Sequence, residues 1–208
     1  AWKSALRTDP QSAFGGIVAC NREITKELAE IMNEIFLEVI IAPIFSKEAL
    51  KVFSSKKNLR LLKTNLINNE AIIGHKIMKD LNDGFLIQDR DLETLNIDNL
   101  NIVTTKKPTE KEIKDLIFAF KVAKHVKSNA IIYAKNNATV GIGAGQMSRI
   151  DSSQIAAIKS QKASKLAGLE NNMAEGSVLA SDAFFPFADG LIAAAEAGVT
   201  SIIQPGGS

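Results

Sequence analysis

The segment Gly-Ile-Gly-Ala-Gly-Gln at residues 141–146 is the most conspicuous candidate for a ligand-binding loop in this chain. Its three glycines would let backbone amide groups come close to a ligand, and Arg149 follows within reach. The planar guanidinium of an arginine can hold a phosphate or a carboxamide through paired hydrogen bonds. A dinucleotide-binding fingerprint needs glycine where Gln146 stands, so a nucleotide-dependent oxidoreductase is disfavoured. The segment predicts either a close-approach loop beside Arg149 or a glycine-rich turn at a strand end.

A second candidate is the aromatic segment at residues 181–189, Ser-Asp-Ala-Phe-Phe-Pro-Phe-Ala-Asp. Strand packing would favour alternating apolar and polar residues and would not place Pro186 in the middle. Aromatic faces stack on flat heterocycles, so the phenylalanines could form the apolar wall of a ring-binding site. Packing in the protein core is the other interpretation, and the sequence leaves both open.

Several other polar residues stand where a functional and a structural role are both conceivable. Asn129 is expected at the start of a strand, where its amide could point into a cleft. Lys124 and His125 lie at the end of a predicted helix, where the helix dipole favours cations, and a structural role accounts for them. His75 is also interpreted as structural. The segment 9–16, Asp-Pro-Gln-Ser-Ala-Phe-Gly-Gly, is either an ordinary loop or a place where a ligand approaches the backbone.

The charge of the chain is nearly balanced, with 25 Lys and Arg against 23 Asp and Glu and a formal net charge of +2. The densest basic runs are pairs of lysines, which are too short for a nucleic-acid-binding stripe. No apolar run approaches the length of a membrane span, and the N-terminus carries no signal-peptide pattern. We therefore expect a cytoplasmic protein that binds small molecules and contacts neither nucleic acid nor membrane.

Cysteine and histidine are scarce, which limits the metal and redox chemistry that the chain can perform. Cys20 is the single cysteine, so an intrachain disulfide cannot form. One cysteine and two histidines cannot supply the usual ligands of a zinc-dependent deaminase, and no zinc is expected. Cys20 follows apolar residues and is expected to be a buried, inert thiol.

Short β-rich runs alternate with amphipathic helical stretches along the chain, which indicates an α/β fold. The pattern in the first half predicts strands at 17–20, 39–42, 59–62 and 85–88, a helix at 25–36, and another helix capped by Ser46. Residues 64–80 are ambiguous, and Asp83-Gly84 is expected to form a turn. A connecting loop is expected at 89–100, and it marks the predicted boundary between two lobes, 1–100 and 101–208.

The second half has clearer signals. Thr109 and Glu112 form a predicted capping box at the start of a helix that carries an apolar stripe as far as Ala123. Two strands, joined by an Asn136-Asn137 turn, are expected to form a hairpin at 130–134 and 139–142. The pattern further predicts a short helix at 152–161, a polar connection at 165–176, a helix capped by Asp189 that runs through Ala197, and a strand at 201–203.

Taken together, these segments resemble one family, the bacterial aminoimidazole carboxamide ribonucleotide (AICAR) transformylases. The resemblance covers nearly the whole chain and keeps the order of the family's motifs. It rests on the loop at 9–16, Glu-Val-Ile-Ile-Ala-Pro at 38–43, Lys-His-Val-Lys-Ser-Asn-Ala at 124–130, the glycine-rich run through Arg149 at 141–149, Ser-Asp-Ala-Phe-Phe-Pro-Phe at 181–187, and Pro-Gly-Gly-Ser at 205–208. Because the sequence starts at Ala1 and stops in that turn-like run, we expect both ends to be cut from a longer polypeptide.

The resemblance implies an α/β fold with three layers and two related, cytidine-deaminase-like lobes that lack the deaminase zinc. It implies formyl transfer from 10-formyltetrahydrofolate to the 5-amino group of AICAR, a step in the synthesis of inosinate (IMP). Full-length members carry an inosinate cyclohydrolase domain on the N-terminal side, and they are homodimers whose active sites draw on both subunits. A homodimer with shared active sites is therefore expected.

The resemblance also assigns site residues. It implies ribotide contacts at Gly15, Glu38, Asn129 and Arg149, although other members carry Asp at the position of Glu38. It implies folate contacts at Ile150, Phe184, Asp189 and Ser208. Ser128 and Asp182 match positions near a monovalent cation, K+ being the candidate. Asn129 is the candidate catalytic residue, because its amide could donate a hydrogen bond to a developing oxyanion.

One family motif is absent from this sequence. The catalytic Lys-His pair of the family stands in a Lys-His-x-Ser-Pro context ahead of the Asp-Pro-x-Ser loop, and no such motif occurs here. Lys124-His125 belongs to the later, helix-ending motif. The chain alone is therefore expected to keep much of the ligand-contacting surface but little turnover. The alternative is a non-catalytic ligand-binding or assembly fragment of the same enzyme.

Overall fold

The computed structural model describes residues 1–64 and 74–206, and it divides the chain into two compact units. One unit, here called the C-terminal unit, comprises Ala1–Gln11 and Leu95–Ser208, and the N-terminal unit comprises Ser12–Thr94. The unit boundary at 94/95 falls inside the predicted connecting loop. The first eleven residues, however, belong to the C-terminal unit and not to the segment that follows them.

The C-terminal unit is built on a four-stranded sheet with the order β7-β6-β8-β9. Strand β6 is antiparallel to both of its neighbours, and β9 is parallel to β8. The strands are β6 (Ile131–Lys135), β7 (Ala138–Gly143), β8 (Val178–Ser181) and β9 (Ser201–Ile203). Three of these strands and the Asn136-Asn137 turn of the hairpin are confirmed predictions. Strand β8 was not predicted.

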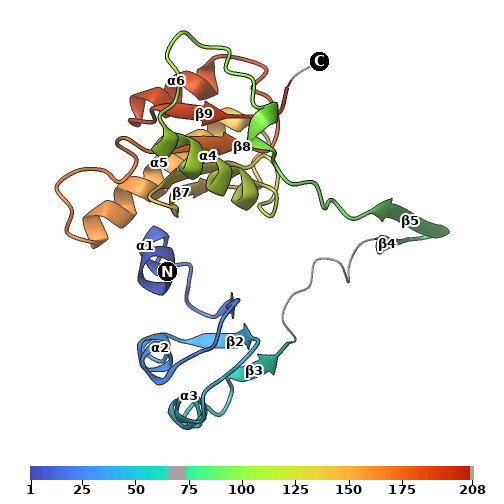
Figure 1. Cartoon of the computed structure of the whole chain (residues 1–208), viewed down its shortest axis with the longest axis vertical. Coiled ribbons are helices and arrows are strands. Elements are labelled where there is room, and N and C mark those ends of the chain that lie inside the picture. The colour runs from blue at the N-terminus through green and yellow to red at the C-terminus, as the bar shows by residue number, and fades with distance from the viewer. Residues whose placement is uncertain (65–73, 207–208) are drawn as a thin grey trace. The chain divides into compact units, whose positions relative to one another are not determined.

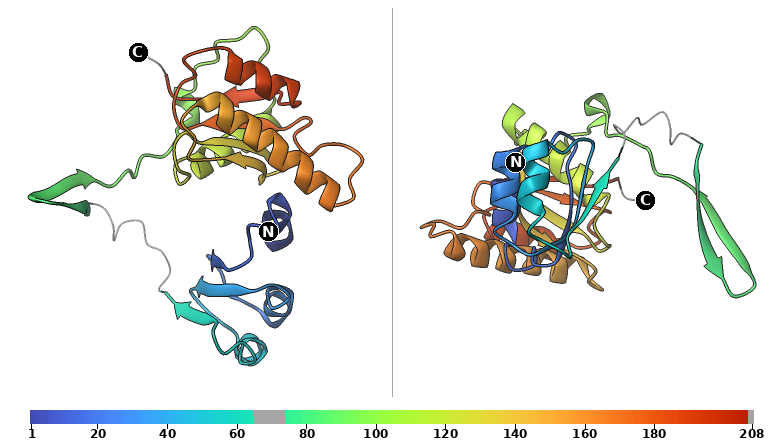
Figure 2. Two further views of the ribbon diagram at one scale, coloured as in Figure 1. Left: turned by 180° about the vertical axis from the view of Figure 1, so that it is seen from behind. Right: turned by 90° about the horizontal axis from the view of Figure 1, so that it is seen from below.

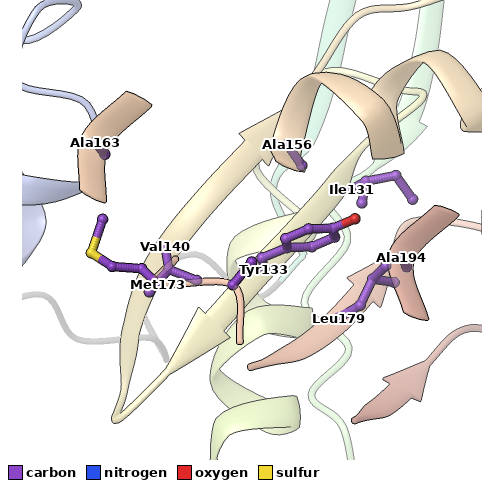
Figure 3. Close-up of a cluster of buried hydrophobic side chains, with 9 residues drawn as sticks. Ile131, Tyr133, Val140, Ala156, Ala163, Met173, Leu179 and Ala194 are labelled. Carbon is purple, nitrogen blue, oxygen red and sulfur yellow. The ribbon is translucent and has the colours of Figure 1, made fainter. Parts of the chain in front are cut away.

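Helices cover both faces of this sheet, which makes the unit three-layered. Helix α4 (Glu110–Ala123) packs on one face, and α5 (Arg149–Leu166) and α6 (Asp189–Glu196) pack on the other (Figures 1 and 2). The central strand β6 therefore alternates between two cores: Ile132 faces α4, while Ile131 and Tyr133 face α5 and α6 (Figure 3). A strand buried on both faces reads as a continuous apolar run, which is what residues 130–134 show.

The ends of these helices show how local sequence sets the geometry. The predicted capping box is present, with the Thr109 hydroxyl accepting from Glu112 N at 3.2 Å and the Glu112 carboxylate accepting from Thr109 N at 2.8 Å. The prediction that Asp189 caps α6 is wrong. Ala188 occupies that position without a side-chain hydrogen bond, and Asp189 is the first helical residue, accepting from Gly190 N at 2.7 Å.

Two helices differ from the sequence-based prediction more strongly. Helix α5 spans 18 residues where 152–161 was expected, because the side that it buries carries serine and alanine and gives no hydrophobic periodicity. Helix α1 (Trp2–Thr8) was not predicted, and it packs against β7 and α5. Its end is held by Thr8 Oγ1, 2.9 Å from Thr139 Oγ1, and by an ion pair of 2.7 Å between Asp9 and Lys159.

The N-terminal unit contains a parallel three-stranded sheet with the order β1-β2-β3. Its elements are β1 (Gly16–Ala19), α2 (Lys26–Met32), β2 (Leu37–Ala42), α3 (Lys47–Phe53) and β3 (Arg60–Lys63). Each was predicted, although α2 ends at Met32 and not at residue 36. Ser46 caps α3 as expected, because its hydroxyl accepts from Ala49 N at 3.0 Å.

A separate two-stranded antiparallel hairpin follows in the sequence, formed by β4 (Lys76–Leu81) and β5 (Gly84–Asp89). Strand β5 and its turn at Asp83-Gly84 were predicted. Strand β4 lies in the segment left ambiguous, and residues 65–73 of that segment lie outside the described residues. Every residue of the hairpin strands is exposed. The predicted connecting loop contains a short helical turn, η2 (Ile97–Asn99). No helix among the described residues is long and apolar enough to cross a membrane.

Candidate functional site

The candidate site in the C-terminal unit centres on Arg149, the first residue of α5. Ser148 caps this helix by accepting a hydrogen bond from Asp151 N at 3.1 Å, and the cap places Arg149 beside the end of β8. The guanidinium donates from Nε to Ser181 Oγ at 3.1 Å and to the Ala183 carbonyl at 3.3 Å. The Arg149 side chain is only 13% exposed, so these bonds are largely shielded from water.

Two further acceptors hold the other nitrogens of the same guanidinium. Nη1 of Arg149 donates to Asn129 Oδ1, and Nη2 forms an ion pair of 3.1 Å with Asp182. An arginine has five N–H donors in a rigid fork. Two of the five are left without an acceptor among the described residues. The guanidinium is therefore fixed in place and still able to donate two hydrogen bonds to a ligand.

Asn129 stands two residues before β6, and both the oxygen and the nitrogen of its side-chain amide are hydrogen-bonded. Its Oδ1 accepts from Arg149, and its Nδ2 donates to the Gln146 carbonyl at 2.8 Å. Its backbone carbonyl accepts from Ser152 Oγ at 2.7 Å, and the Ser128–Asn129 peptide bond is cis. The structure thus brings Asn129 and Arg149, from segments 20 residues apart, into direct contact.

Asp182 joins the guanidinium to the sheet. Its Oδ1 accepts from Arg149 Nη2 and, at 3.0 Å, from Ala130 N at the entry to β6. Its own backbone N–H donates to the Ala130 carbonyl at 3.3 Å. The carboxylate thus connects the end of β8, the start of β6 and the start of α5. A monovalent cation near Ser128 and Asp182 stays a prediction.

The glycine-rich run is not the close-approach loop that one interpretation of the sequence expected. Gly141 and Gly143 lie inside β7, where α5 packs directly on the strand. A Cβ atom on Gly141 would lie 2.3 Å from the Ala156 carbonyl oxygen, and one on Gly143 would lie 1.8 Å from that of Ser152. Both glycines therefore admit a helix backbone and not a ligand. Gly145, with φ of +69°, lies in the turn that follows the strand.

The phenylalanine segment is divided between the two interpretations that the sequence left open. Phe185 packs against the core, with its ring closed over Gly190, and its backbone N–H donates to Gln204 Oε1 at 2.9 Å. Phe184 is 39% exposed and Phe187 is 73% exposed. One ring therefore belongs to the core, and the other two leave aromatic surface open to solvent.

The residues predicted to contact folate lie around the first turns of α5 and α6, as far as they are described. Ile150 is partly buried, and its backbone nitrogen lies 3.8 Å from where a Cβ on Gly190 would be. Asp189 is exposed at the start of α6. Phe184 follows β8. Ser208 lies outside the described residues.

The other two predicted ribotide residues, Gly15 and Glu38, belong to the N-terminal unit. Gly15 has φ of +73°, and its N–H donates to the Phe36 carbonyl at 2.9 Å. Glu38 is exposed on β2, with its Oε1 atom 3.8 Å from where a Cβ on Gly15 would be. The structure therefore assembles the four ribotide candidates as two pairs, Gly15 with Glu38 and Asn129 with Arg149.

The other titratable residues considered in the sequence are Cys20, His75 and His125. Cys20 is half-buried and not fully buried as predicted, and this burial raises the pKa of its thiol, which disfavours the reactive thiolate. His75 and His125 are exposed. Within residues 1–64 and 74–206, no group of three or more His, Cys, Asp or Glu side chains is placed to hold a metal ion.

Ser181 and Ser152 take part in the site, although the sequence gave no sign of Ser152 and showed Ser181 only as the first residue of the segment 181–189. Ser181 is fully buried and accepts from Arg149, whereas Ser152 donates to the Asn129 carbonyl. Serine is common in loops and helix caps, so only its burial beside Arg149 and Asn129 distinguishes it here. Gln146 stands where a dinucleotide-binding fingerprint needs glycine. In the structure it contributes its backbone carbonyl, which accepts from Asn129 Nδ2 and which any residue would provide.

The fold and the site together define an α/β protein with a fixed, largely buried guanidinium that can bind an anionic or carbonyl-bearing ligand. The chain belongs to the AICARFT/IMPCHase bienzyme family, whose model matches residues 1–159. It is 54% identical, over all 208 residues, to the bifunctional purine biosynthesis protein PurH of Rhodospirillum rubrum. It is 55% identical, again over its whole length, to the proteins of the same name from Bartonella henselae and Parvibaculum lavamentivorans. The chain spans 38–39% of the length of these relatives.

Proposed function

We propose that this chain contributes to purine biosynthesis by forming part of an AICAR transformylase site. The formyl group would pass from 10-formyltetrahydrofolate to the 5-amino group of AICAR, giving formyl-AICAR and tetrahydrofolate. The observation that carries the proposal is the Arg149–Asn129 pair, since both residues lie in motifs of the matched family and still have N–H groups free for a ligand. The names of the relatives, which are purine biosynthesis proteins, support the assignment.

The reaction joins two unreactive partners. The AICAR amine is electron-poor because its lone pair is conjugated with the carboxamide-bearing ring, and the formyl donor is an amide-like nitrogen acyl. A bond forms between the amine nitrogen and the formyl carbon, the bond from that carbon to the folate nitrogen breaks, and a proton passes from the amine to the folate nitrogen. The site must orient both molecules, remove this proton and stabilise the oxyanion that develops on the formyl oxygen.

The residues of the C-terminal unit can meet two of these needs. The two unused N–H groups of Arg149 would hold the ribotide by its phosphate or carboxamide. The second N–H of Asn129 Nδ2 would donate to the oxyanion, a contribution of about 3 kcal/mol when one such donor is well placed. The exposed face of Phe184 would stack on the folate ring, and the Asp189 carboxylate would accept from pterin N–H groups. Gly15 and Glu38 would complete the ribotide contacts, and K+ is the cation proposed near Ser128 and Asp182.

Proton removal needs a base that this chain does not contain. In the family the candidate base is the histidine of the Lys-His-x-Ser-Pro motif, which is absent from these 208 residues. We therefore propose that the chain by itself binds ligands and turns over slowly. A purely non-catalytic binding or assembly role is the second candidate, and the absence of the Lys-His-x-Ser-Pro motif from these 208 residues favours it.

Other parts of the proposal concern the protein that carries this chain. A homodimer with shared active sites, two related cytidine-deaminase-like lobes, a cyclohydrolase domain and a cytoplasmic location would accompany the transformylase assignment. The family and its motifs support these parts of the proposal.

Titration of the isolated chain tests the assignment directly. Isothermal calorimetry with AICAR and with a non-reactive folate analogue is expected to give binding of both, while a transformylase assay is expected to give only trace turnover. The matched control is Arg149→Met, which keeps an unbranched side chain about as far as the Nε position and removes every donor. Turnover at the rate of intact relatives would contradict the role assigned to the missing histidine. Binding of neither ligand would contradict the site.

A further inference from the structure

The proposed function places Asp182 near a monovalent cation but gives no role to its contact with Arg149. It is a largely buried carboxylate, 18% exposed, that faces the equally shielded Arg149 side chain. Taking such a pair out of water is costly unless further hydrogen bonds satisfy both groups. On the carboxylate side, Asp182 Oδ1 has two such bonds, because it accepts both from Arg149 Nη2 at 3.1 Å and from Ala130 N at 3.0 Å.

Ser181 completes the support on the other side of the guanidinium. Its hydroxyl donates to the Ala183 carbonyl at 2.7 Å, which directs a lone pair at Arg149 Nε, 3.1 Å away. The serine is fully buried, so no water competes for either bond. Ser181 and Asp182 thus accept from two different nitrogens, and rotation of the guanidinium about its side chain would break both contacts.

We propose that Asp182 and Ser181 are positioning residues: together they fix Arg149 so that its two unused N–H groups point at the ribotide. This inference rests on the proposed function, since it names what holds that site's arginine in place. Asp182 adds a second constraint through Ala130. Because Asn129 precedes Ala130, the same carboxylate keeps Asn129 and Arg149 in a constant relative position.

Without Asp182, the Arg149 guanidinium would still carry its charge, but its N–H groups would no longer be held in one fixed orientation. Attraction of an anionic ligand would persist, whereas the paired geometry would be populated only part of the time. Misplacement of a binding group by about 1 Å can cost on the order of 100-fold in rate. The loss should appear in the kinetic parameters of the ribotide and leave those of the folate nearly unchanged.

The test compares Asp182→Ala with Asp182→Asn in the intact protein that carries this chain. The alanine variant removes both the charge and the acceptor, and kcat/KM for AICAR is expected to fall about 100-fold. The asparagine variant keeps an acceptor oxygen for Arg149 and Ala130, and most of the activity should be rescued. KM for 10-formyltetrahydrofolate is expected to stay within about twofold in both variants. Ser181→Ala should show a smaller loss of the same kind.

Asp115 provides the matched control, because it is a buried carboxylate of the same unit that also accepts from two donors. It binds the backbone N–H groups of Asn136 and Asn137 at 2.9 and 2.7 Å, at the opposite end of β6 from Asn129. Asp115→Ala should lower the melting temperature and leave kcat/KM for AICAR near that of the wild type, when both are assayed well below the transition.

Activity and ribotide binding are read separately, so that the two proposals can fail independently. A wild type that binds AICAR but transfers no formyl group would overturn the proposed function, and the ratio of AICAR Kd values between Asp182→Ala and wild type would still decide the positioning role. The positioning role would be overturned if Asp182→Ala and Asp115→Ala changed the Kd for AICAR by the same factor relative to the wild type. Equal kcat/KM values for AICAR in Asp182→Ala and Asp115→Ala would also overturn it. Absence of AICAR binding by the wild type would overturn both.

Discussion

Asn129 uses both atoms of its side-chain amide, with Oδ1 accepting from Arg149 and Nδ2 donating to Gln146. One N–H of the amide is left for a ligand, whereas Arg149 keeps three other anchors: Ser181, the Ala183 carbonyl and Asp182. Loss of the Asn129 side chain therefore removes a donor completely but loosens Arg149 only in part. On the proposed function, this division of roles predicts that Asn129 affects turnover more than binding.

Asn129→Ala in the intact protein is consequently expected to lower kcat by about 100-fold while KM for AICAR changes by only a few-fold. An oxyanion donor acts mainly in the transition state, and its removal typically costs 10²–10³ in kcat. Steady-state kinetics with AICAR as the varied substrate measure both parameters. Equal losses in kcat and in AICAR affinity would assign Asn129 to ground-state binding.

Glu112 is the residue for which a pH dependence can be stated with its direction. Its pKa is lowered from 4.5 to about 2, chiefly because the Thr200 hydroxyl donates to it, with further donors from Thr109. A carboxyl whose folded pKa is lowered stabilises the folded state above its unfolded pKa and loses that contribution as the pH falls. The window here therefore runs from about pH 4.5 down to about pH 2.

Glu112→Gln is expected to lower the free energy of unfolding at pH 7, and this difference from the wild type should shrink steadily below pH 4.5. Urea unfolding curves at several pH values from 7 to 2.5 measure it. Thr200→Val removes the leading cause of the low pKa, so it should reproduce part of the same pH dependence. A difference between Glu112→Gln and wild type that is constant with pH would contradict the account.

At the scale of elements, the contact between α5 and β7 depends on two glycines and on a helix face made of small side chains. The buried positions of α5 are Ser152, Ser153, Ala156, Ser160, Ala163 and Ser164. Because Gly143 has no Cβ, the Ser152 carbonyl can lie directly on the strand. This contact also sets the depth at which Arg149 enters the site, since Arg149 begins the same helix.

Gly143→Ala is therefore expected to destabilise the chain by about 3 kcal/mol, because the added Cβ would overlap the Ser152 carbonyl and force α5 away from the sheet. Urea denaturation provides the measurement. Gly84→Ala is the control, since a Cβ on that strand glycine meets no atom within 4 Å, and it should change stability by less than about 0.5 kcal/mol. A neutral Gly143→Ala would show that the helix does not pack this closely.

The elements that could be predicted from the sequence are those that depend on local residues, and the α5–β7 contact is not of this kind. Strand β6, the capping box at Thr109 and the Ser46 cap were predictable, because each depends on neighbouring residues alone. The full length of α5 was not, because its buried side is small and polar and fits only the glycines of β7. Strand β8 was missed because its run of apolar residues is only Val178-Leu179-Ala180 and it pairs with strands distant in sequence.

The two central residues of the site could be predicted from the sequence, but the contacts between them could not. Arg149 and Asn129 were singled out because a guanidinium near a glycine run and an amide at a strand start are visible as residue types. Their direct contact, and the support from Ser181 and Asp182, depend on the antiparallel pairing of β6 with β8, which brings Ile131 opposite Ser181. No local pattern in the sequence encodes that register.

At the scale of the whole molecule, one compact unit is formed by two segments that are separated in the sequence. Residues 1–11 belong with 95–208, and residues 12–94 form the other unit between them. Helix α1 adds to the edge strand β7 and to α5 through the Thr8–Thr139 contact and the Asp9–Lys159 ion pair. An edge strand covered in this way is protected from pairing with other chains. The first eleven residues should thus contribute to the stability of a unit that begins more than eighty residues later.

This expectation can be tested by comparing residues 95–208 alone with the same segment joined to residues 1–11 through a flexible glycine-serine linker. The joined polypeptide should be the more stable, by about 1–3 kcal/mol in urea unfolding, because α1 buries Thr8 and covers β7. A joined polypeptide carrying Thr8→Ala and Asp9→Ala should lose most of the gain, since the Thr8–Thr139 hydrogen bonds and the Asp9–Lys159 ion pair are removed. The segment alone should also self-associate more strongly, which sedimentation velocity would detect, because β7 would then present an open edge. Equal stability and equal association of the two polypeptides would place residues 1–11 outside the cooperative unit, and the division of the chain would have to begin at residue 95.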